Sequence, residues 1–397
     1  MSFMPTCIEK ISPMVYERLN KITKFSKNRL IYMVVAEKIK KIRFKQGSDA
    51  QFYDTVKNRV GEEFAKRGLS YNANAEMYLK SAIMVIAYLS IYFSIISNYF
   101  GAVGVIVLYG LLGLAKGLMG FNLTHDALHG SYSSNTTVNR ILGYTFDFNG
   151  TSSLIWKIAH NVHHHTYTNI PGFDEDIDKA IWLRLSPKDR LYWFHRFQHW
   201  YAPVLYCLTG LNWVFVSDYT WFIREAAKRK ISKKDIAIFL TFKLINLFLF
   251  IIYPLIHLNV AWWVVILGYL CLQFVGGLTI ALIFQLAHIV EPVKYFEPNE
   301  EGQMRHNWAI HEMYTTSNFA TNNKVLSTIV GGLNFQVEHH LFPYICHVHY
   351  KIIAPIVKKT AEEFGIPYYE QPTFFAALRS HFRTLKMLGR STGKISV

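Results

Sequence analysis

Two long apolar blocks dominate the pattern of hydrophobic and polar positions along this chain. They run from about residue 77 to 121 and from about 236 to 287. Each is more than twice the ~20 residues that a helix needs to cross the hydrocarbon core of a bilayer. Polar residues interrupt the apolar sequence near 98–101 and 257–259, so each block is predicted to form a hairpin of two spans. The expected spans are residues 77–99, 101–121, 236–257 and 261–287.

A shorter apolar run, from Tyr201 to Val216, is interpreted differently. It has only 16 residues and contains a proline and many aromatic residues, which suits a helix lying in the membrane interface better than a span. Lys116 and Lys243 fall inside the expected spans. We expect their side chains to snorkel to the membrane surface, the alternative being a functional charge inside the membrane.

Composition and charge agree with a membrane protein and indicate its orientation. Of the 397 residues 51% are hydrophobic, and 42 Lys and Arg against 27 Asp and Glu give a net charge of +15. Nearly all the basic residues lie in 1–76, 122–235 and 288–397, and the positive-inside rule places these segments in the cytoplasm. A basic chain also suits nucleic acid, but the charges are dispersed around the spans without a recognition module, so no nucleic-acid partner is expected.

Residues 1–76 are predicted to form a short cytoplasmic segment before a membrane domain of residues 77–397. The N-terminus lacks the basic stub, apolar core and small-residue cleavage site of a secretory signal. The four cysteines are far apart and show no CxxC spacing, so neither a disulfide framework nor a zinc ribbon is indicated. The cysteines are interpreted as structural.

Candidate chemistry lies in three histidine clusters just beyond the expected spans. In HDALH, His125 and His129 are four residues apart and share one face of a helix. In QVEHH, Gln336, His339 and His340 fall at i, i+3 and i+4, with an amide in the first place. One such pair is weak evidence, but the repetition makes the pattern specific for metal binding.

The middle cluster, HNVHHH, offers the most imidazoles. In an α-helix His160, His163 and His164 fall at i, i+3 and i+4 and share a face, while His165 points elsewhere. Imidazole suits zinc, copper, iron and nickel. Seven or more histidines exceed the four ligands of one tetrahedral zinc site and therefore indicate two ions. Two iron ions can share O₂ and deliver an oxidising species.

These motifs resemble the three histidine boxes of the membrane fatty acid desaturase family. HDALHG, HNVHHHTYTNIPGFDEDID and NFQVEHHLFP match the boxes in order and spacing, and the resemblance runs from about residue 77 to beyond 343. It implies an all-α integral membrane protein with four transmembrane helices in two hairpins and a helical cytoplasmic cap. The cap would hold a histidine-ligated, non-haem di-iron site. The implied activity is the O₂-dependent desaturation of an acyl chain carried by coenzyme A or by a lipid.

The resemblance also implies finer details. Gln336 stands where most members carry histidine, which is typical of front-end desaturases of the delta-5 or delta-6 type. The N-terminal segment has no HPGG haem motif of a fused cytochrome b5 domain, so we expect a separate electron donor such as cytochrome b5 or a ferredoxin. His288 in FQLAHIVE lies where the family places a further ligand. His311 lies in a stretch that resembles related bacterial-type desaturases.

Other polar residues are interpreted as neighbours of the metal centre. Asp174 and Asp176 in DEDID are expected to bond to ligating imidazoles, the alternative being a solvated loop. Gln336 is expected to hold a water or to orient a ligand, unless it is an exposed helix residue. An ordinary surface histidine explains His311 equally well. The histidines that receive no metal role are His195, His199, His257, His306, His347, His349 and His381.

Rival functions fit parts of the pattern. A hydroxylase or ketolase on the same scaffold would return oxygen to the first substrate radical, and the sequence hardly separates it from a desaturase. A membrane metal transporter would need ligands along the spans, whereas these histidines gather beyond the span ends. A carboxylate di-iron protein needs Glu-x-x-His motifs on bundled helices, which this sequence lacks. The expected site is therefore an all-histidine di-iron centre.

Overall fold

The fold is helical in the part of the chain that the structure describes. This computed structural model describes residues 42–45, 50–178, 181–228 and 231–390. Within these ranges the strands β1 (Ser317–Phe319) and β2 (Tyr369–Gln371) are short and pair in parallel. The all-α prediction is confirmed, and the expectation for residues 1–41 lies outside the described residues.

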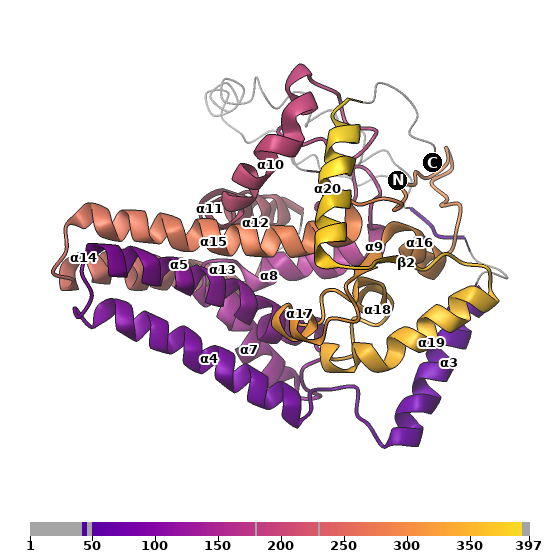
Figure 1. Cartoon of the computed structure of the whole chain (residues 1–397), viewed down its shortest axis with the longest axis horizontal. Helices are drawn as coiled ribbons and strands as arrows, with labels where there is room; N and C mark the ends of the chain where they lie inside the picture. The colour runs from indigo at the N-terminus through magenta and orange to yellow at the C-terminus, as the bar shows by residue number, and fades with distance from the viewer. Residues whose placement is uncertain (1–41, 46–49, 179–180, 229–230, 391–397) are drawn as a thin grey trace, which may run out of the picture.

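Four long apolar helices project to one side of the molecule as two hairpins (Figure 1). Each is long and apolar enough to cross a membrane, so the predicted four spans are confirmed. The spans are Ala75–Ile96, Ala102–His129, Lys233–His257 and Trp262–His288. The first span is the single helix α4 and the fourth is the single helix α15. The second span consists of α5 (Ala102–Met119), η2 (Gly120–Thr124) and α6 (His125–His129). The third span consists of α13 (Lys233–Leu247), η6 (Phe248–Ile252) and α14 (Tyr253–His257).

The outward faces of the spans are apolar. Ile86, Val107 and Ile252 are between 45% and 64% exposed, although each lies inside a hydrophobic run of its span. Apolar surface of this extent is rare on soluble monomers and belongs against lipid. The chain is therefore an integral membrane protein.

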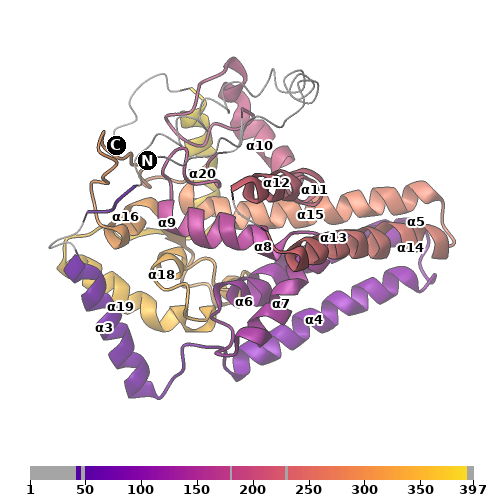
Figure 2. The same cartoon turned by 180° about the vertical axis from the view of Figure 1, so that it is seen from behind.

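The remaining helices form a cap at one end of the spans or pack beside that end (Figure 2). α3 packs on α19 through a shared core that includes Phe52, Val56 and Val357, so part of the segment before residue 76 belongs to the cap. The domain boundary at residue 76 stays a prediction. The helices concerned are α3 (Ala50–Arg67), α7 (Thr136–Phe148), α8 (Ser153–Trp156), η3 (Lys157–His164), α9 (His165–Tyr167), α16 (Trp308–Thr315), α17 (Lys324–Ile329), α18 (Gln336–Leu341), η7 (His347–His349), α19 (Tyr350–Glu363) and α20 (Phe374–Leu388).

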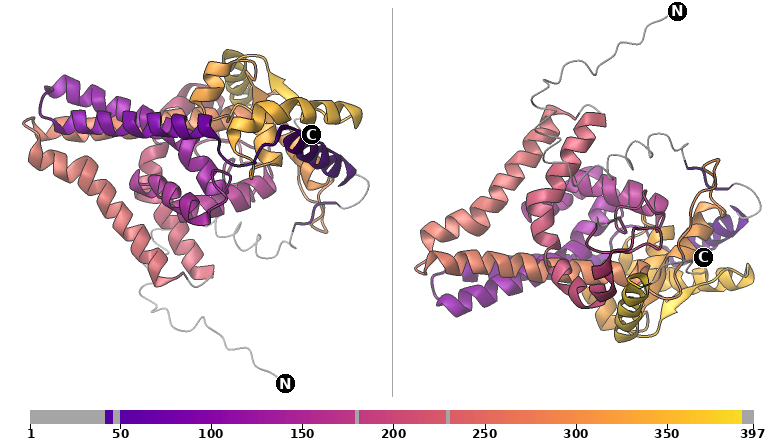
Figure 3. Two further views of the ribbon diagram at one scale, coloured as in Figure 1. Left: turned by 90° about the horizontal axis from the view of Figure 1, so that it is seen from below. Right: turned by 90° about the horizontal axis from the view of Figure 1, so that it is seen from above.

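The run from Tyr201 to Val216 forms short helices that cross α15. A Cβ on Gly277 of α15 would lie 2.8 Å from the Cys207 oxygen, so the two chains touch through their backbones. Figure 3 shows the third span diverging from α15 toward the cap, with α7 packed against it. The helices of the run are α10 (Gln198–Cys207), α11 (Thr209–Asn212) and η5 (Trp213–Ser217). They are preceded by η4 (Trp193–Phe197) and followed by α12 (Asp218–Lys228).

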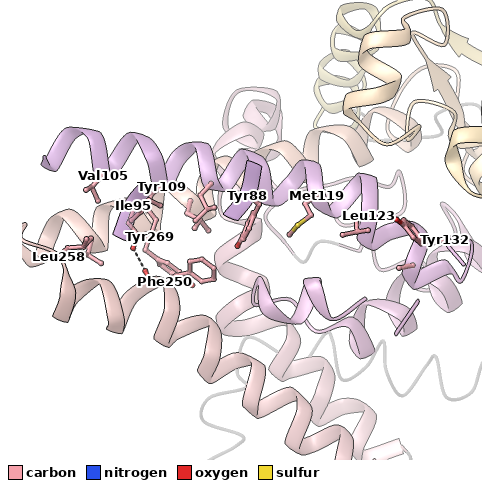
Figure 4. Close-up of a cluster of buried hydrophobic side chains, with 14 of the residues drawn as sticks. Tyr88, Ile95, Val105, Tyr109, Met119, Leu123, Tyr132, Phe250, Leu258 and Tyr269 are labelled. Carbon is pink, nitrogen blue, oxygen red and sulfur yellow. Dashed lines mark hydrogen bonds between the residues drawn. The ribbon is translucent and has the colours of Figure 1, made fainter. Parts of the chain in front are cut away.

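The second and fourth spans approach each other closely because the residues at their contact include glycines, which have no side chain to keep the helices apart. A Cβ on Gly113 would lie 2.3 Å from the Leu272 oxygen, and one on Gly276 would lie 3.1 Å from the Gly113 oxygen. Small residues allow such approach between transmembrane helices. Beside this contact Tyr109 donates to the Phe250 carbonyl at 2.9 Å, within the buried cluster drawn in Figure 4, and so joins the second span to the third.

Lys116 and Lys243 do not snorkel, so the prediction for these two residues is wrong. Lys116 is buried and donates to Gln273 Oε1 at 3.0 Å. Lys243 is also buried; its Nζ lies 2.7 Å from Asp218 Oδ2 and donates to the Gly150 carbonyl at 2.7 Å. Partners on neighbouring helices and loops hold both ammonium groups inside the protein, and the local sequence does not reveal such partners.

Candidate metal centre

The first histidine cluster continues the second span. The helix passes from α5 through the wider turns of η2 into α6, where His125 and His129 lie with ring centroids 4.6 Å apart. Gly130 ends this helix in the left-handed conformation at φ +78°, which glycine adopts without a side-chain penalty. The transmembrane helix thus carries both imidazoles directly into the cap.

The second cluster requires a correction. It lies on η3, a π-helix whose hydrogen bonds span five residues, so side chains four and five positions apart share a face. His160, His164 and His165 are therefore buried together, and the Nε2 atoms of His160 and His165 lie 3.2 Å apart. His163 turns toward Trp221, with ring centroids at 5.6 Å. The expectation that His163 joins the site and His165 points elsewhere is wrong because it assumed α-helical spacing.

α18 and the end of α15 complete the set. His339 and His340 lie on α18 and are fully buried, and His288 is the last residue of α15. The ring centroid of His288 lies 4.8 Å from that of His340 and 4.7 Å from that of His164. Segments more than a hundred residues apart in sequence therefore meet at one point.

The histidines meet in two adjacent groups. The ring nitrogens of the first group all lie within 4.8 Å of one another: His125, His129, His160 and His339. The same distance holds within the second group: His164, His288 and His340. His165 lies between the groups, with ring centroids 4.6 Å from His339 and 4.4 Å from His340. Each group brings enough imidazole nitrogens together to hold one metal ion.

The unused nitrogen atoms fit two metal ions. Nε2 is buried without a hydrogen-bond partner in His129, His164, His288, His339 and His340. In four of these rings Nδ1 has a partner instead: the Asp174 carboxylate for His164, the Thr315 carbonyl for His288, the Tyr350 hydroxyl for His339 and the Thr168 hydroxyl for His340. Such a bond at Nδ1 leaves the Nε2 lone pair for a metal. A buried nitrogen without a partner is costly, and a bound ion removes that cost.

The chemistry of the donors narrows the choice of metal. Both groups consist of imidazoles, which suit iron, zinc, copper and nickel. A single tetrahedral zinc site takes four ligands, fewer than the two groups supply together. The residues present therefore fit a pair of transition-metal ions.

Asp174 lies beside the second cluster, in the position expected from the sequence. Its Oδ1 accepts from His164 Nδ1 at 3.0 Å, and Asp176 Oδ2 lies 3.5 Å from the same nitrogen. Burial opposes a charge on His164, but the two carboxylates outweigh it and raise the pKa of His164 to about 9. The solvated-loop alternative fails for Asp174, which is fully buried.

Two residues that contact the histidines of α18 were not identified from the sequence pattern. Glu312 Oε2 lies 2.8 Å from His340 Nδ1, and burial raises the pKa of Glu312 well above its ordinary value. The Tyr350 hydroxyl lies 3.1 Å from His339 Nδ1. A carboxylate inside the mostly apolar stretch WAIHEMYT was the available signal for Glu312, because a buried acid needs a partner. No comparable signal marked Tyr350.

Gln336 and His311 are buried but lie outside both histidine groups. Gln336 is 1% exposed, so the alternative of an exposed helix amide is wrong. His311 is fully buried, so the surface alternative is wrong for it as well. His311 Nε2 is hydrogen-bonded to the Thr168 carbonyl at 2.7 Å, and its ring contacts Phe44. His311 therefore supports the segment that follows the second cluster.

A further buried cluster joins the first histidine cluster to the segment after α18. Asp126 Oδ2 accepts from His347 Nδ1 at 2.7 Å and from Cys346 Sγ at 3.0 Å. Lys80 Nζ donates to His347 Nε2 at 2.5 Å, which leaves the His347 proton on Nδ1. These bonds satisfy the cluster without a metal. It braces α6 against η7, in agreement with the structural role expected for His347.

A small cavity lies beside the second span, one helical turn before the first histidine cluster. Lys116, Gly120 and Thr124 line one side at helical spacing, and Phe146 and Trp213 line the other. Thr124 directly precedes the first histidine of α6. The cavity has a volume of about 10 Å³, which is room for about one water molecule, and no histidine lines it.

Several known proteins are similar to this chain. The family model described as fatty acid desaturase matches residues 97–372. The chain is 36% identical to an sn-1 linoleoyl-lipid 6-desaturase of Arthrospira platensis over 86% of its own length and 94% of that protein. It is 37% identical to a protein of the same description from Synechocystis sp., over 91% of its length and 100% of that protein. It is 32% identical to an acyl-lipid (8-3)-desaturase of Physcomitrium patens, over 93% of its own length and 78% of that protein.

Proposed function

Because the chain belongs to the fatty acid desaturase family, we propose that it is a front-end desaturase that introduces a cis double bond between the carboxyl end and an existing double bond of a lipid-linked acyl chain. The observation that carries this proposal is the convergence of buried imidazoles with unpaired Nε2 atoms at the cap ends of the spans. The names of the relatives support a delta-6 or delta-5 position and a lipid-linked substrate. The residue Gln336 supports the front-end type.

In this proposal the two histidine groups each hold one iron ion. The ligands are His125, His129, His160 and His339 for one ion, and His164, His288 and His340 for the other, with His165 available to either. When bound, the iron pair would supply the reduction of O₂ and the oxidising power to remove hydrogen from an unactivated methylene. Asp174 and Glu312 orient the second group, and Asp176 adds negative charge beside it.

The chain's own residues position the substrate and exclude water. The ligating rings are nearly all buried under the cap, so bulk water does not reach them. The acyl chain would lie between the transmembrane helices and the cap, where the histidine groups are found. In the balanced reaction, two hydrogen atoms leave adjacent methylenes, and two electrons and two protons arrive from outside. One O₂ is thereby converted to two waters.

The metal centre is proposed to face the cytoplasm and to receive its electrons from a separate donor protein. The dispersion of basic residues outside the spans supports this orientation through the positive-inside rule. The histidines cluster at the cap ends of the spans and not along them, which speaks against a transport path for metal ions.

Two histidines of the second cluster, His163 and His165, give a matched test of the site. The chain is expressed in a desaturase-free host together with a ferredoxin or cytochrome b5, and the cells are fed linoleate. Fatty acid methyl esters are then analysed by gas chromatography for the wild type, His165→Ala and His163→Ala. We expect a new double bond on the carboxyl side in the wild type and in His163→Ala, and its loss in His165→Ala.

The other outcomes are equally informative. A hydroxylated acyl chain would transfer the assignment to a hydroxylase on the same scaffold. Absence of any new product in the presence of an active donor would contradict the acyl substrate. Equal loss of product in both variants would show that His163 is needed as much as His165, which contradicts the proposed placement of His165 at the metal groups and His163 away from them.

A further inference from the structure

The outer face of α20 carries a basic stripe. Arg379, Arg383 and Lys386 lie at i, i+4 and i+7 and so share one face, and Arg390 follows just beyond the helix end. All four are exposed, and α20 contains neither Asp nor Glu. Arg390 also lines an open surface hollow together with Arg196 of η4. The result is a surface of concentrated positive charge.

The position of α20 relative to the spans favours a partner in water for the stripe. α20 lies on the side of α10 that is away from the tips of the spans, as two opposite views show (Figures 1 and 2). The outward face of α10 is apolar, with Trp200 76% and Val204 62% exposed, and this face suits the membrane interface. Gln198 of α10 donates to the Leu385 carbonyl at 2.7 Å and so holds α20 by its inner side. The charged side of α20 is left for a soluble partner.

The inner face of α20 contacts the chain next to the metal groups. His381 Nδ1 donates to the Ile289 carbonyl at 2.9 Å, and Ser380 Oγ accepts from the Glu291 N–H at 2.9 Å. Ile289 directly follows His288, whose ring belongs to the second histidine group. One hydrogen bond and one peptide link thus connect α20 to a residue at the centre of the site. An electron that arrives at α20 has a short bonded route inward.

We propose that the basic stripe of α20 is the docking surface for a soluble, acidic protein that carries one electron at a time. This inference rests on the proposed function, because desaturation consumes two external electrons in each turnover. Each docking event oxidises one carrier by one electron. Two such events, with two protons from solvent, balance the formation of one double bond and two waters from one O₂. Opposite charges on the two proteins speed their encounter and fix their orientation.

Binding tests this proposal without the reaction. The full chain in nanodiscs of neutral phosphatidylcholine is titrated with a [2Fe–2S] ferredoxin and with the soluble domain of a cytochrome b5, at low and high salt. The test variant is Arg383→Glu/Lys386→Glu. The control is Lys57→Glu/Lys66→Glu, which makes the same change in net charge on exposed positions of α3. We expect at least ~10-fold weaker binding of one carrier and a lost salt dependence in the test variant alone.

Three results would overturn the proposal. The first is equal affinity of the wild type and the test variant for both carriers. The second is equal weakening by the α3 control, because the effect would then come from net charge. The third is carrier binding that the variant leaves unchanged, combined with loss of the wild type's binding to separate vesicles that contain anionic phosphatidylglycerol, which would assign the stripe to the lipid surface.

A chemical reductant separates this proposal from the proposed function. With dithionite in place of the carrier, the iron-loaded test variant should form product at the wild-type rate, because docking is bypassed. If the wild type forms no product with dithionite and a linoleoyl lipid, the proposed function fails. The binding measurement would still decide the docking surface.

Discussion

His164 Nδ1 donates to Asp174 Oδ1 at 3.0 Å, and this bond links the second histidine cluster to the loop that follows it. The carboxylate is itself held by the backbone N–H groups of Asn169 and Asp176, at 2.8 and 2.9 Å. A ring anchored at Nδ1 keeps its Nε2 directed toward the second histidine group. The orientation of the His164 ring in that group therefore depends on a loop that supplies none of the group's three imidazoles.

Asp174→Asn is expected to weaken metal binding. The amide keeps one acceptor but loses the charge that orients His164, and loss of such a partner costs about 10- to 100-fold in metal affinity. The metal-free chain would be titrated with Co²⁺ in competition with a chelator. The exposed Asp54→Asn on α3 serves as the control. Wild-type affinity in Asp174→Asn would show that this carboxylate does not orient a ligand.

Gly113→Ala is expected to separate two spans. The new Cβ would lie 2.3 Å from the Leu272 oxygen, so α5 and α15 must move apart, at a cost of about 1–3 kcal/mol or more. Gly110→Ala, one turn earlier on the same helix, meets nothing within 4 Å and should be neutral or slightly stabilising. Thermal unfolding in detergent measures both variants. Equal midpoints would contradict the close contact.

Lys243→Met is expected to destabilise the protein by about 3–5 kcal/mol, because it leaves the buried Asp218 carboxylate without its cation. Lys243→Met/Asp218→Asn should recover much of this loss, since the amide still accepts from the Ser152 N–H. Unfolding of the single and double variants forms a double-mutant cycle. The exposed Lys234→Met on α13 should have little effect, and additive losses in the cycle would mean that the ion pair is not coupled.

The contact of α20 with α15 is expected to weaken in acid. Burial lowers the pKa of His381 to about 4, while the backbone bond to Ile289 partly opposes it. The ordinary value in the unfolded chain is about 6.5, so the stability is present above that pH and is lost as pH falls toward 4, by up to about 3 kcal/mol. Protonation of Nε2 also removes the acceptor of the Tyr206 hydroxyl bond at 2.8 Å.

Unfolding of the wild type and His381→Gln between pH 7 and pH 4 measures this effect. Glutamine does not titrate in this range, so the advantage of the wild type should shrink as the pH falls. A difference between the two proteins that stays constant with pH would contradict the assignment to His381.

The sequence alone determined the four spans and the presence of a histidine site. Length and hydropathy decide whether a helix crosses a membrane, and both are local properties of the chain. The recurrence of histidines around His125, His160 and His339 is likewise visible in the sequence itself. For this reason the all-α fold and the two-ion interpretation needed no knowledge of tertiary contacts.

The tertiary structure decided which side chains take part. The π-helical turn of η3 turns His165 inward and His163 outward, and residue spacing does not encode the change from an i→i+4 to an i→i+5 hydrogen-bond pattern. Glu312 and Asp218 find their buried partners, His340 and Lys243, on other helices. A buried charge is tolerated only where distant segments supply its partner, and that pairing exists only once the chain has folded.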